Sequence, residues 1–256
     1  MHILIDIGNT NVLFGKFEST NLLDQLRVET NILNNELLLP SNETQKKIIN
    51  FFGEECSDCF VSGVVPDTVS LLINFLRESL NINTVEINNE YLRTIINVDV
   101  EKPHEVGVDR LINSFAGLHL YDKPLIIIDF GTATTFDLVS NNGSYIGGII
   151  CPGVNLSIQS LAKNTAKLPL IKIKKVERVI GKDTTTAIQS GIYWGYVSLV
   201  NGLIDKLKKE NGFKNSHIIA TGGLSGLFEN DLPKIQNYEP DLTLKGLNII
   251  YNEYKK

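Results

Sequence analysis

The sequence predicts an α/β protein made of two related halves, each with a mixed β-sheet flanked by helices. The first observation is a pair of similar apolar runs half a chain apart, at residues 3–7 and 126–130, each with an aspartate near its end and a glycine after it. The second is that each run is followed by another strand-like run and then by helical and strand-like segments. The third is composition: the 256 residues are 43% apolar and 21% charged, as in a globular protein large enough for two domains.

The first half begins with a predicted hairpin. Ile3 to Ile7 is rich in β-branched residues and is predicted to be a buried strand, and Asn11 to Phe17 is the returning strand. Gly8 to Thr10 forms the turn between them, since glycine permits a tight turn close to a ligand. A third strand is expected around Gln25 to Glu29.

The rest of the first half alternates helices and strands. Pro66 begins a helix because proline is favoured in a first helical turn. The predicted elements are a helix from Ser41 to Phe52 with Ser41 as its N-cap and a Glu43–Lys47 pair, a strand from Cys59 to Val65, a helix from Pro66 to about Leu80, and a strand from Thr84 to Ile87.

The second half repeats this plan. Asn141-Asn142-Gly143 has the composition of a hairpin turn, and Gly212 ends a long predicted helix. The predicted strands are Leu125 to Asp129, Thr134 to Val139, Tyr145 to Ile150 and His217 to Thr221, and the predicted helices are Leu156 to Lys163, Thr184 to Glu210 and Lys245 to Tyr254.

Three strands followed by helices and strands, repeated once, is the plan of the actin-like (ribonuclease H-like) ATPase folds, which include sugar and acetate kinases. The domain boundary is expected in the helix after Gly107, so that residues 1–114 form one domain and 115–256 the other. This analogy concerns the fold and does not specify the chemistry.

Composition excludes several classes of function. The net charge of -5 and the short basic runs at 172–175 and 206–209 argue against nucleic acid as a partner. The three cysteines argue against a disulfide framework and for a reducing cytoplasm. No secretory signal is evident at the start, and the longest apolar stretch, Ile188 to Ile204, is interrupted by polar residues, so no membrane span is expected.

The two Asp-x-Gly turns are the strongest candidates for a nucleotide site. Backbone amides and hydroxyls in such turns can hold phosphate oxygens. A carboxylate beside phosphate would be repelled, so Asp6 and Asp129 are predicted to hold cations that bridge to the phosphate. The alternative is that each aspartate only caps its turn. Their matched contexts favour a phosphate and cation site.

Three further motifs are weaker on their own. Thr221 to Ser225 is a glycine-rich turn into a helix, which suits adenosine binding or a plain connection. Glu105 to Arg110 could form a polar pocket for an anionic substrate and proton transfer, or a salt-bridged helix start. Cys56 and Cys59 have the spacing of half a zinc site, but the sequence offers no second pair of ligands.

With these motifs the chain closely resembles the type III pantothenate kinases along nearly its whole length. Single blocks are weak evidence, whereas their ordered set is specific. The matching blocks are Asp6 to Asn11, Glu105 to Arg110, Asp129 to Thr135, Gly147 to Gly153, Thr165 to Pro169, Ile180 to Thr184, Ser190-Gly191 and Thr221 to Gly223.

The resemblance implies ATP-dependent phosphorylation of the primary hydroxyl of pantothenate to 4'-phosphopantothenate, the first step of coenzyme A synthesis. It implies that Asp109 accepts the proton of that hydroxyl, that Asp129 binds a monovalent cation (K⁺ or NH₄⁺), and that Asp6 meets Mg²⁺ through the phosphates. It also implies a homodimer with a shared substrate site. The implied ATP-binding residues are Asp6, Ile7, Gly8, Asn9, Thr10, Asn11, Val12, Leu13 and Thr132, and the implied pantothenate-binding residues are Gly107, Val108, Asp109, Arg110 and, from the neighbouring subunit, Thr184.

Departures from the family are modest. Val108 replaces a usual alanine, and Val100 lies where many members have an aromatic residue that contacts pantothenate. Two other functions stay open at this point: a sugar or carboxylate kinase of the same superfamily, and a transcription-linked accessory factor of the same family. A filament-forming protein of the actin class is a third, which the Glu105 to Arg110 block disfavours.

Overall fold

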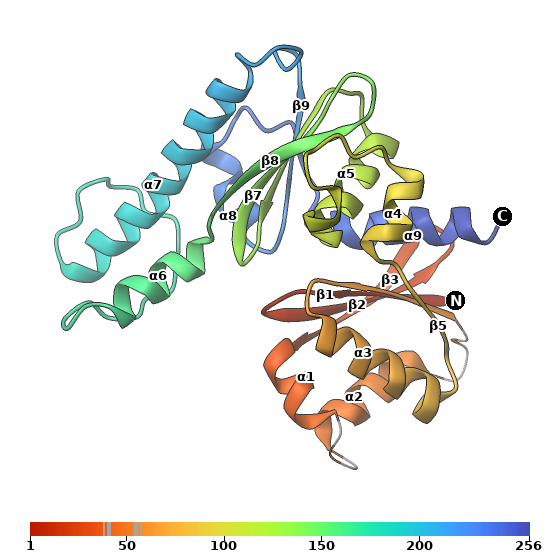
Figure 1. Ribbon diagram of the computed structural model, residues 1–256. Coiled ribbons are helices and arrows are strands. Elements are labelled where there is room, and N and C mark those ends of the chain that lie inside the picture. The colour runs from red at the N-terminus through yellow and green to blue at the C-terminus, as the bar shows by residue number, and fades with distance from the viewer. Residues whose placement is uncertain (38, 40–41, 54–55, 57) are drawn as a thin grey trace. The chain divides into compact units, whose positions relative to one another are not determined.

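The computed structural model describes all residues except 38, 40–41, 54–55 and 57 (Figure 1). The chain divides into two compact units. Unit 1 contains residues 1–97, 101–116 and 243–256, and unit 2 contains residues 98–100 and 117–242. The sequence analysis places the domain boundary between residues 114 and 115. In the structure the chain passes from unit 1 to unit 2 between Ala116 and Gly117, and residues 243–256 belong to unit 1.

Unit 1 is built on a five-stranded sheet of order β3-β2-β1-β4-β5. The strands β1, β2 and β3 are antiparallel, whereas β4 pairs parallel to β1 and β5 parallel to β4. The strands are β1 (His2–Ile7), β2 (Asn11–Glu18), β3 (Asn21–Glu29), β4 (Asp58–Gly63) and β5 (Asn83–Glu86). The helical segments are α1 (Thr30–Glu36), α2 (Glu43–Phe52), α3 (Pro66–Asn74), the π-helical η1 (Phe75–Ser79), α4 (Asn89–Ile95), η2 (Pro103–Glu105), α5 (Val108–Leu120, shared with unit 2) and α9 (Leu242–Tyr254).

The two faces of this sheet are covered by different helices. Ile3, Ile5 and Ile7 alternate along β1 and pack into an apolar cluster with residues of α1, α2 and α3. The residues between them face the other way, where His2 shares a 2.7 Å hydrogen bond with Asn248 of α9 and stacks on Tyr251. The Asp6 face of the sheet is therefore the one toward α9, and it also carries the candidate site.

Unit 2 repeats the same strand order, β8-β7-β6-β9-β10, with β6 and β7 in the places of β1 and β2. Its strands are β6 (Leu125–Phe130), β7 (Ala133–Val139), β8 (Tyr145–Pro152), β9 (His217–Thr221) and β10 (Asn237–Tyr238). Its helices are α6 (Val154–Lys163), α7 (Thr184–Leu207), α8 (Ser225–Phe228) and η3 (Glu229–Asp231). A large apolar cluster joins one face of the sheet to α6, α7 and α8. The predicted fold class, two duplicated α/β units, is confirmed.

Most predicted elements are confirmed with small changes at their ends. The helix predicted from Ser41 begins at Glu43, where the side chain of Asn42 accepts a hydrogen bond from the Gln45 amide; Ser41 lies outside the described residues. The Glu43–Lys47 pair is present at 2.7 Å. The helices α1 and α4 and the short strand β10 were not predicted. Each is short, so its hydrophobic period is too weak to identify it.

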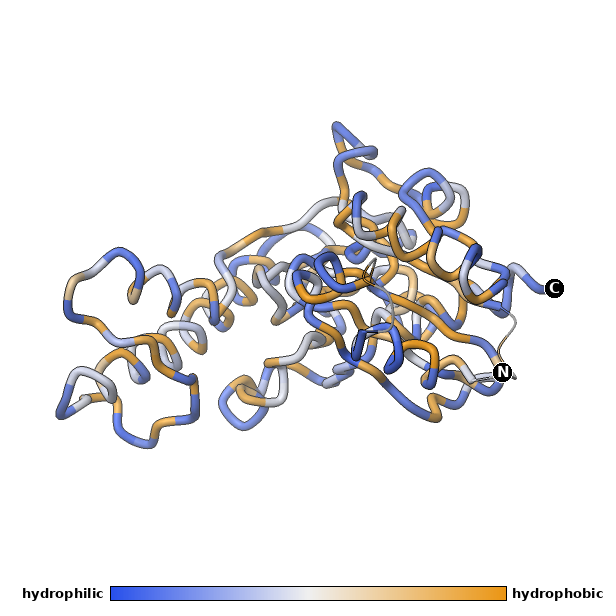
Figure 2. The backbone as a smooth tube through the Cα atoms, turned by 90° about the horizontal axis from the view of Figure 1, so that it is seen from below, coloured by the Kyte–Doolittle hydropathy of each residue, from blue (hydrophilic) through white to orange (hydrophobic). Residues whose placement is uncertain are grey.

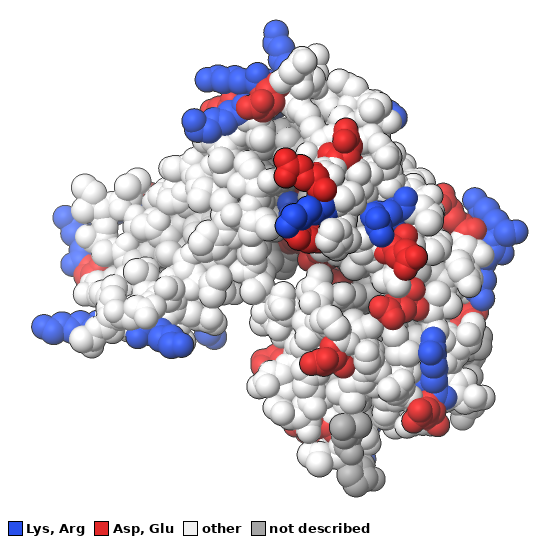
Figure 3. All heavy atoms as spheres, viewed as in Figure 1, with Lys and Arg blue, Asp and Glu red and all other residues white. Residues whose placement is uncertain are grey.

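Among the described residues no helix is long and apolar enough to cross a membrane. Figure 2 shows hydrophobic and hydrophilic residues interspersed along the helices. Basic and acidic side chains both occur across the face drawn in Figure 3. This mixed distribution agrees with the absence of a strong basic run in the sequence.

Candidate functional site

The first candidate turn connects β1 to β2 and is fixed by hydrogen bonds from outside the hairpin. The Gly8 amide donates to the Asn11 carbonyl at 2.9 Å. From the start of α1, Thr30 donates its hydroxyl to the Gly8 carbonyl at 2.7 Å and its amide to the Thr10 carbonyl at 3.0 Å. Asn9, between these anchors, is exposed. The turn is therefore held in shape while its tip faces solvent.

Asp6 stands next to this turn in an environment that opposes its charge. Its pKa is raised to about 7, first by burial and then by the charge of the neighbouring Asp109, while the charge of Arg27 lowers it. Burial also raises the pKa of Asp109, whose carboxyl accepts a 2.8 Å hydrogen bond from the Arg110 amide. Unit 1 thus brings together two carboxyls that lie far apart in the sequence.

The segment before α5 explains how Asp109 reaches this position. A Cβ atom on Gly107 would lie 2.6 Å from the Asp109 Oδ1, so only glycine leaves room for the carboxyl there. Asn89 of α4 donates to the carbonyls of Pro103 and Val106, at 3.1 and 2.8 Å, and so fixes the preceding loop. Asp109 itself lies in the first turn of α5.

Glu105 does not belong to the same polar pocket. Its carboxylate pairs with Lys102 at 2.8 Å, and both side chains are exposed. The prediction of one pocket formed by both carboxylates and the arginine is therefore wrong for Glu105. The salt-bridged helix start, the alternative interpretation of this motif, describes Glu105 correctly.

The second candidate turn connects β6 to β7 and is enclosed by two glycines. The Gly131 amide donates to the Ala133 carbonyl at 3.1 Å. A side chain on Gly153 would overlap the Thr132 carbonyl, and one on Gly222 would lie 2.8 Å from the Phe130 backbone and still closer to Asp129. Asp129 pairs with Thr135 and Thr221 on its neighbouring strands, so three oxygen-bearing side chains share one face of the sheet.

The third turn follows β9. Gly222 has a positive φ of 87°, which glycine adopts without strain, and Ser225 donates its hydroxyl to the Gly222 carbonyl at 2.8 Å. The helix that follows, α8, has only four residues. A strong helix dipole at this turn is therefore not available, and the glycine backbone itself is its distinctive feature.

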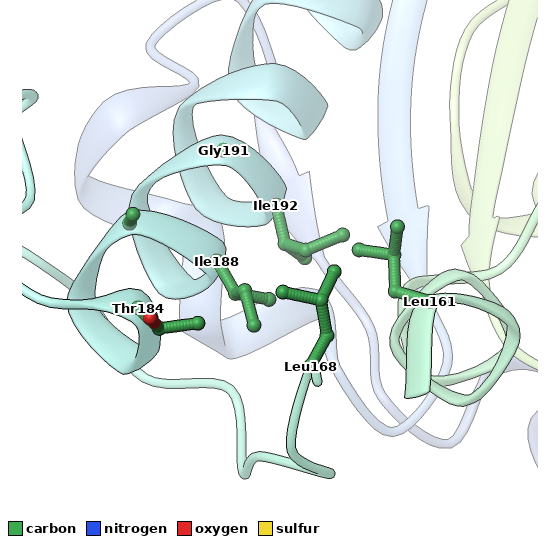
Figure 4. A pocket seen from close by; sticks show the side chains of 7 residues that line it. Leu161, Leu168, Thr184, Ile188, Gly191 and Ile192 are labelled. Carbon is green, nitrogen blue, oxygen red and sulfur yellow. The ribbon is translucent and has the colours of Figure 1, made fainter. Parts of the chain in front are cut away.

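Thr184 belongs to none of these turns and lies in the first turn of α7. The side chain of Asp183 caps the helix by accepting a 2.9 Å hydrogen bond from the Thr186 amide. Thr184 borders a groove of about 560 Å³ in which leucine and isoleucine side chains of α6, α7 and the loop between them point toward one another (Figure 4). The groove is lined by Leu161, Leu168, Thr184, Ala187, Ile188, Gly191 and Ile192.

Two parts of the sites were not identified from the sequence. Thr30 holds the first turn from a position 22 residues beyond Gly8, and no local pattern marks it. Arg27, which acts on the pKa of Asp6, was identified only as part of a strand. Cys56 and Cys59 are buried, and burial raises the pKa of both thiols, whereas reactive cysteines have lowered pKa values.

The family model and two similar curated proteins indicate the same family for this chain. The family model described as type III pantothenate kinase matches residues 2–206. A type III pantothenate kinase from Agathobacter rectalis is 34% identical over 100% of this chain and 98% of its own length. Another, from Caulobacter vibrioides, is 39% identical over 98% of this chain and 97% of its own length.

Solved structures resemble this chain in fold. A protein assigned as a 2-dehydro-3-deoxygalactonokinase from Sinorhizobium meliloti has a TM-score of 0.62 at 9% identity, covering 99% of this chain and 96% of its own. A protein assigned to the Baf family of transcriptional activators, from Campylobacter jejuni, has a TM-score of 0.61 at 18% identity, covering 99% and 98%. At these identities the likeness concerns the fold alone.

Proposed function

Since the chain belongs to the type III pantothenate kinase family, it is an ATP-dependent pantothenate kinase, and we propose here how its residues serve that reaction. The reaction is phosphorylation of pantothenate, the opening step of coenzyme A synthesis. Two alternative functions, a sugar or carboxylate kinase and a transcription-linked accessory factor, are disfavoured. The relatives at 34% and 39% identity, matched over nearly their full length, are pantothenate kinases, whereas the likeness to the Baf family protein is one of fold.

Asp109 is the general base of this proposal. The pantothenate hydroxyl gives its proton to the Asp109 carboxylate as its oxygen bonds to the terminal phosphorus of ATP, and the bond from that phosphorus to the ADP oxygen breaks. The observation that carries this role is the position of Asp109 in the first turn of α5, where Gly107 leaves space for the carboxyl and burial raises its pKa. A raised pKa brings a carboxylate base closer to the working pH.

The nucleotide is assigned to the turns. Residues Asp6 to Leu13 hold the phosphates of ATP, because their backbone is fixed by Thr30 and their tip is exposed. Thr132 contributes from the second turn, and the glycine backbone at 221–223 accommodates adenosine. Gly107, Val108 and Arg110 bind pantothenate together with Asp109, the guanidinium of Arg110 pairing with the substrate carboxylate.

Mg²⁺ fits the donor set around Asp6. Among the described residues no group of three or more His, Cys, Asp or Glu could hold a metal alone. Mg²⁺ in kinases is commonly held by one or two carboxylates together with substrate phosphates, and the carboxyl of Asp6 beside the first turn meets that need. When bound, Mg²⁺ would neutralise charge on the phosphates and on Asp6.

We assign a monovalent cation, K⁺ or NH₄⁺, to Asp129. The support is its oxygen surroundings, since Thr135 and Thr221 share its face of the sheet and Gly222 packs against its carboxylate. Such oxygen ligands suit hard cations. This cation assists binding of the transferred phosphoryl group by its charge.

We also propose a homodimer in which Thr184 reaches the pantothenate site of the neighbouring subunit. An exposed stripe of small residues runs along α7 with helical spacing: Thr184, Ala187, Gly191, Gly195, Ser198 and Gly202. Each glycine inside a helix costs roughly 0.5–1 kcal/mol relative to alanine. Close approach of a second helix to this stripe offsets that cost.

The base assignment is tested by comparing Asp109→Asn with the parent enzyme in a pantothenate- and ATP-dependent kinase assay. We expect turnover to fall by roughly 10²–10⁴-fold, because the amide cannot accept the proton at the same position. Glu105→Gln is the matched control, since its carboxylate pairs with the exposed Lys102, and its turnover should stay near that of the parent. Unchanged turnover in Asp109→Asn would sink the assignment.

A further inference from the structure

Arg27 lies in line with Asp6 across the sheet of unit 1. In the strand register Asp6 of β1 pairs with Leu13 of β2, and Leu13 pairs with Arg27 of β3. Residues directly opposite each other in antiparallel strands project to the same face. Arg27 is therefore on the Asp6 face, two strands away, which is roughly 10 Å at the usual strand spacing. This is a gap that the long arginine side chain can largely span.

The surroundings of Arg27 leave its charge available. Arg27 is exposed, and Leu13 between it and Asp6 is half-buried and apolar. The opposite face of the same strands holds Val12, Phe14 and Val28 in the apolar cluster of unit 1. Arg27 is therefore on the face away from that cluster, two residues before Glu29, which pairs with Asn11 at the end of the first turn.

The carboxyls near the first turn would repel a polyphosphate unless a positive charge lies close to them. Asp6 and Asp109 are both carboxyls and lie close enough to interact by charge. Arg27 is on the same face as Asp6 in the strand register, so its cationic side chain is on the side of the site. A polyphosphate arriving at this turn adds further negative charge, which two carboxylates repel and a guanidinium attracts.

The duplication within the chain provides an internal comparison. In unit 2 the equivalent line runs from Asp129 of β6 to Thr135 of β7 and then to Ile150 of β8. Ile150, at the place of Arg27, is 66% exposed and apolar. Both positions are near the surface, so the sheet does not demand a particular residue there. Of these two matched positions, the one in unit 1 has a positively charged side chain, that of Arg27, and the one in unit 2 has an apolar side chain.

We propose that Arg27 binds the terminal phosphates of the nucleotide held at the first turn. This inference rests on the proposed function and adds to it a phosphate ligand from β3. A planar guanidinium can contact two phosphate oxygens at once and keeps its charge at any working pH. Charge-assisted hydrogen bonds of this kind make the contact specific for the phosphate chain rather than for adenosine.

Nucleotide binding without pantothenate tests this inference. The affinities of the parent, Arg27→Gln and Arg27→Lys for MgATP would be measured by calorimetry, and those for AMP by displacement of a fluorescent nucleotide. Loss of a charged hydrogen bond corresponds to an affinity change of roughly 10- to 100-fold, which we expect for MgATP in Arg27→Gln. AMP, which lacks the terminal phosphates, should change by no more than about twofold, and Arg27→Lys should recover part of the loss.

Lys16→Gln is the charge-matched control. Lys16 is on β2, three residues from Leu13 and hence on the opposite face, where its ammonium lies 5.1 Å from the centre of the Phe51 ring. The affinity of Lys16→Gln for MgATP should equal that of the parent. An unchanged MgATP affinity in Arg27→Gln, or an equal loss for MgATP and AMP, would overturn the inference.

The same proteins separate this inference from the proposed function. A parent enzyme that phosphorylates pantothenate while Arg27→Gln binds MgATP normally contradicts only the role of Arg27. A parent that binds MgATP but transfers no phosphoryl group to pantothenate contradicts the proposed function and leaves the role of Arg27 to be decided by the binding data.

Discussion

Asp6 is kept in the folded protein under conditions that oppose its ionisation. Its pKa of about 7 results first from burial and then from the charge of Asp109. Asp109 in turn owes its place to Gly107, whose missing side chain leaves space for the carboxyl. The binding of a cation relieves this repulsion. Residues of the site are therefore arranged for the ligand-bound state, and the ligand-free protein is less stable as a result.

This argument predicts the pH dependence of stability. Because the folded pKa of Asp6 is about 7 and the unfolded value is near 4, the folded state binds more protons between those pH values. Its free energy of unfolding therefore decreases as pH rises from about 4 through 7. Asp6→Asn removes this group, so without ligands the variant should gain stability over the parent by up to a few kcal/mol at pH 8 and little at pH 4.

Urea denaturation at both pH values measures the effect, and MgATP binding by the same variant should be strongly reduced. The prediction would be contradicted if Asp6→Asn and the parent differed in free energy of unfolding by the same amount at pH 4 and at pH 8.

At the scale of elements, each hairpin turn is shaped by residues from elsewhere in its unit. Thr30 at the start of α1 anchors the first turn through two hydrogen bonds. Gly153 before α6 and Gly222 after β9 enclose the second turn. The aspartates and turn glycines could be predicted from the sequence because they are local features. The anchor Thr30 could not, because nothing local marks a threonine that acts across the sheet. Gly153 and Gly222 lie in motifs found in the sequence, but their packing around the second turn is seen only in the structure.

Gly222→Ala and Gly223→Ala form a matched pair that tests this enclosure. A Cβ at 222 meets Asp129 and the Phe130 backbone at a positive φ, whereas a Cβ at 223 meets nothing within 4 Å. We expect Gly222→Ala to reduce the free energy of unfolding by roughly 1–3 kcal/mol and Gly223→Ala to change it by less than about 0.5 kcal/mol.

The displaced Asp129 should also raise the potassium concentration needed for half-maximal activity in Gly222→Ala. Thermal unfolding and a potassium titration of kinase activity give both readouts. If Gly222→Ala and Gly223→Ala had the same stability and the same potassium requirement, the close packing at Gly222 would affect neither property.

At the scale of the whole molecule, one strand order is used twice and carries different chemistry each time. Unit 1 has the proposed base Asp109, the proposed metal ligand Asp6 and Arg27, whereas unit 2 has Asp129 with two threonines on its face of the sheet, and a long helix. The helix α7 extends over 24 residues and exposes its small residues along one side.

Gly191→Arg tests the homodimer. An arginine on the exposed stripe would block close approach of a second helix, so the variant should sediment as a monomer and lose most of its turnover, since Thr184 could not reach the neighbouring site. Gly226→Arg is the control for oligomeric state, because Gly226 is exposed on another helix and a Cβ added there would meet nothing within 4 Å. A dimeric Gly191→Arg protein would contradict the role of the stripe.

The sequence by itself determined the fold class, the hairpin turns and the family, because alternating apolar runs and the ordered motifs are local properties of the chain. It also identified Asp6, Asp109 and Asp129 as candidates. Only the tertiary structure separated Glu105 from Asp109, brought Asp109 beside Asp6 and placed Arg27 on the Asp6 face. The physical reason is that strand register and helix packing set which distant side chains share a face, and with it their burial and mutual charge.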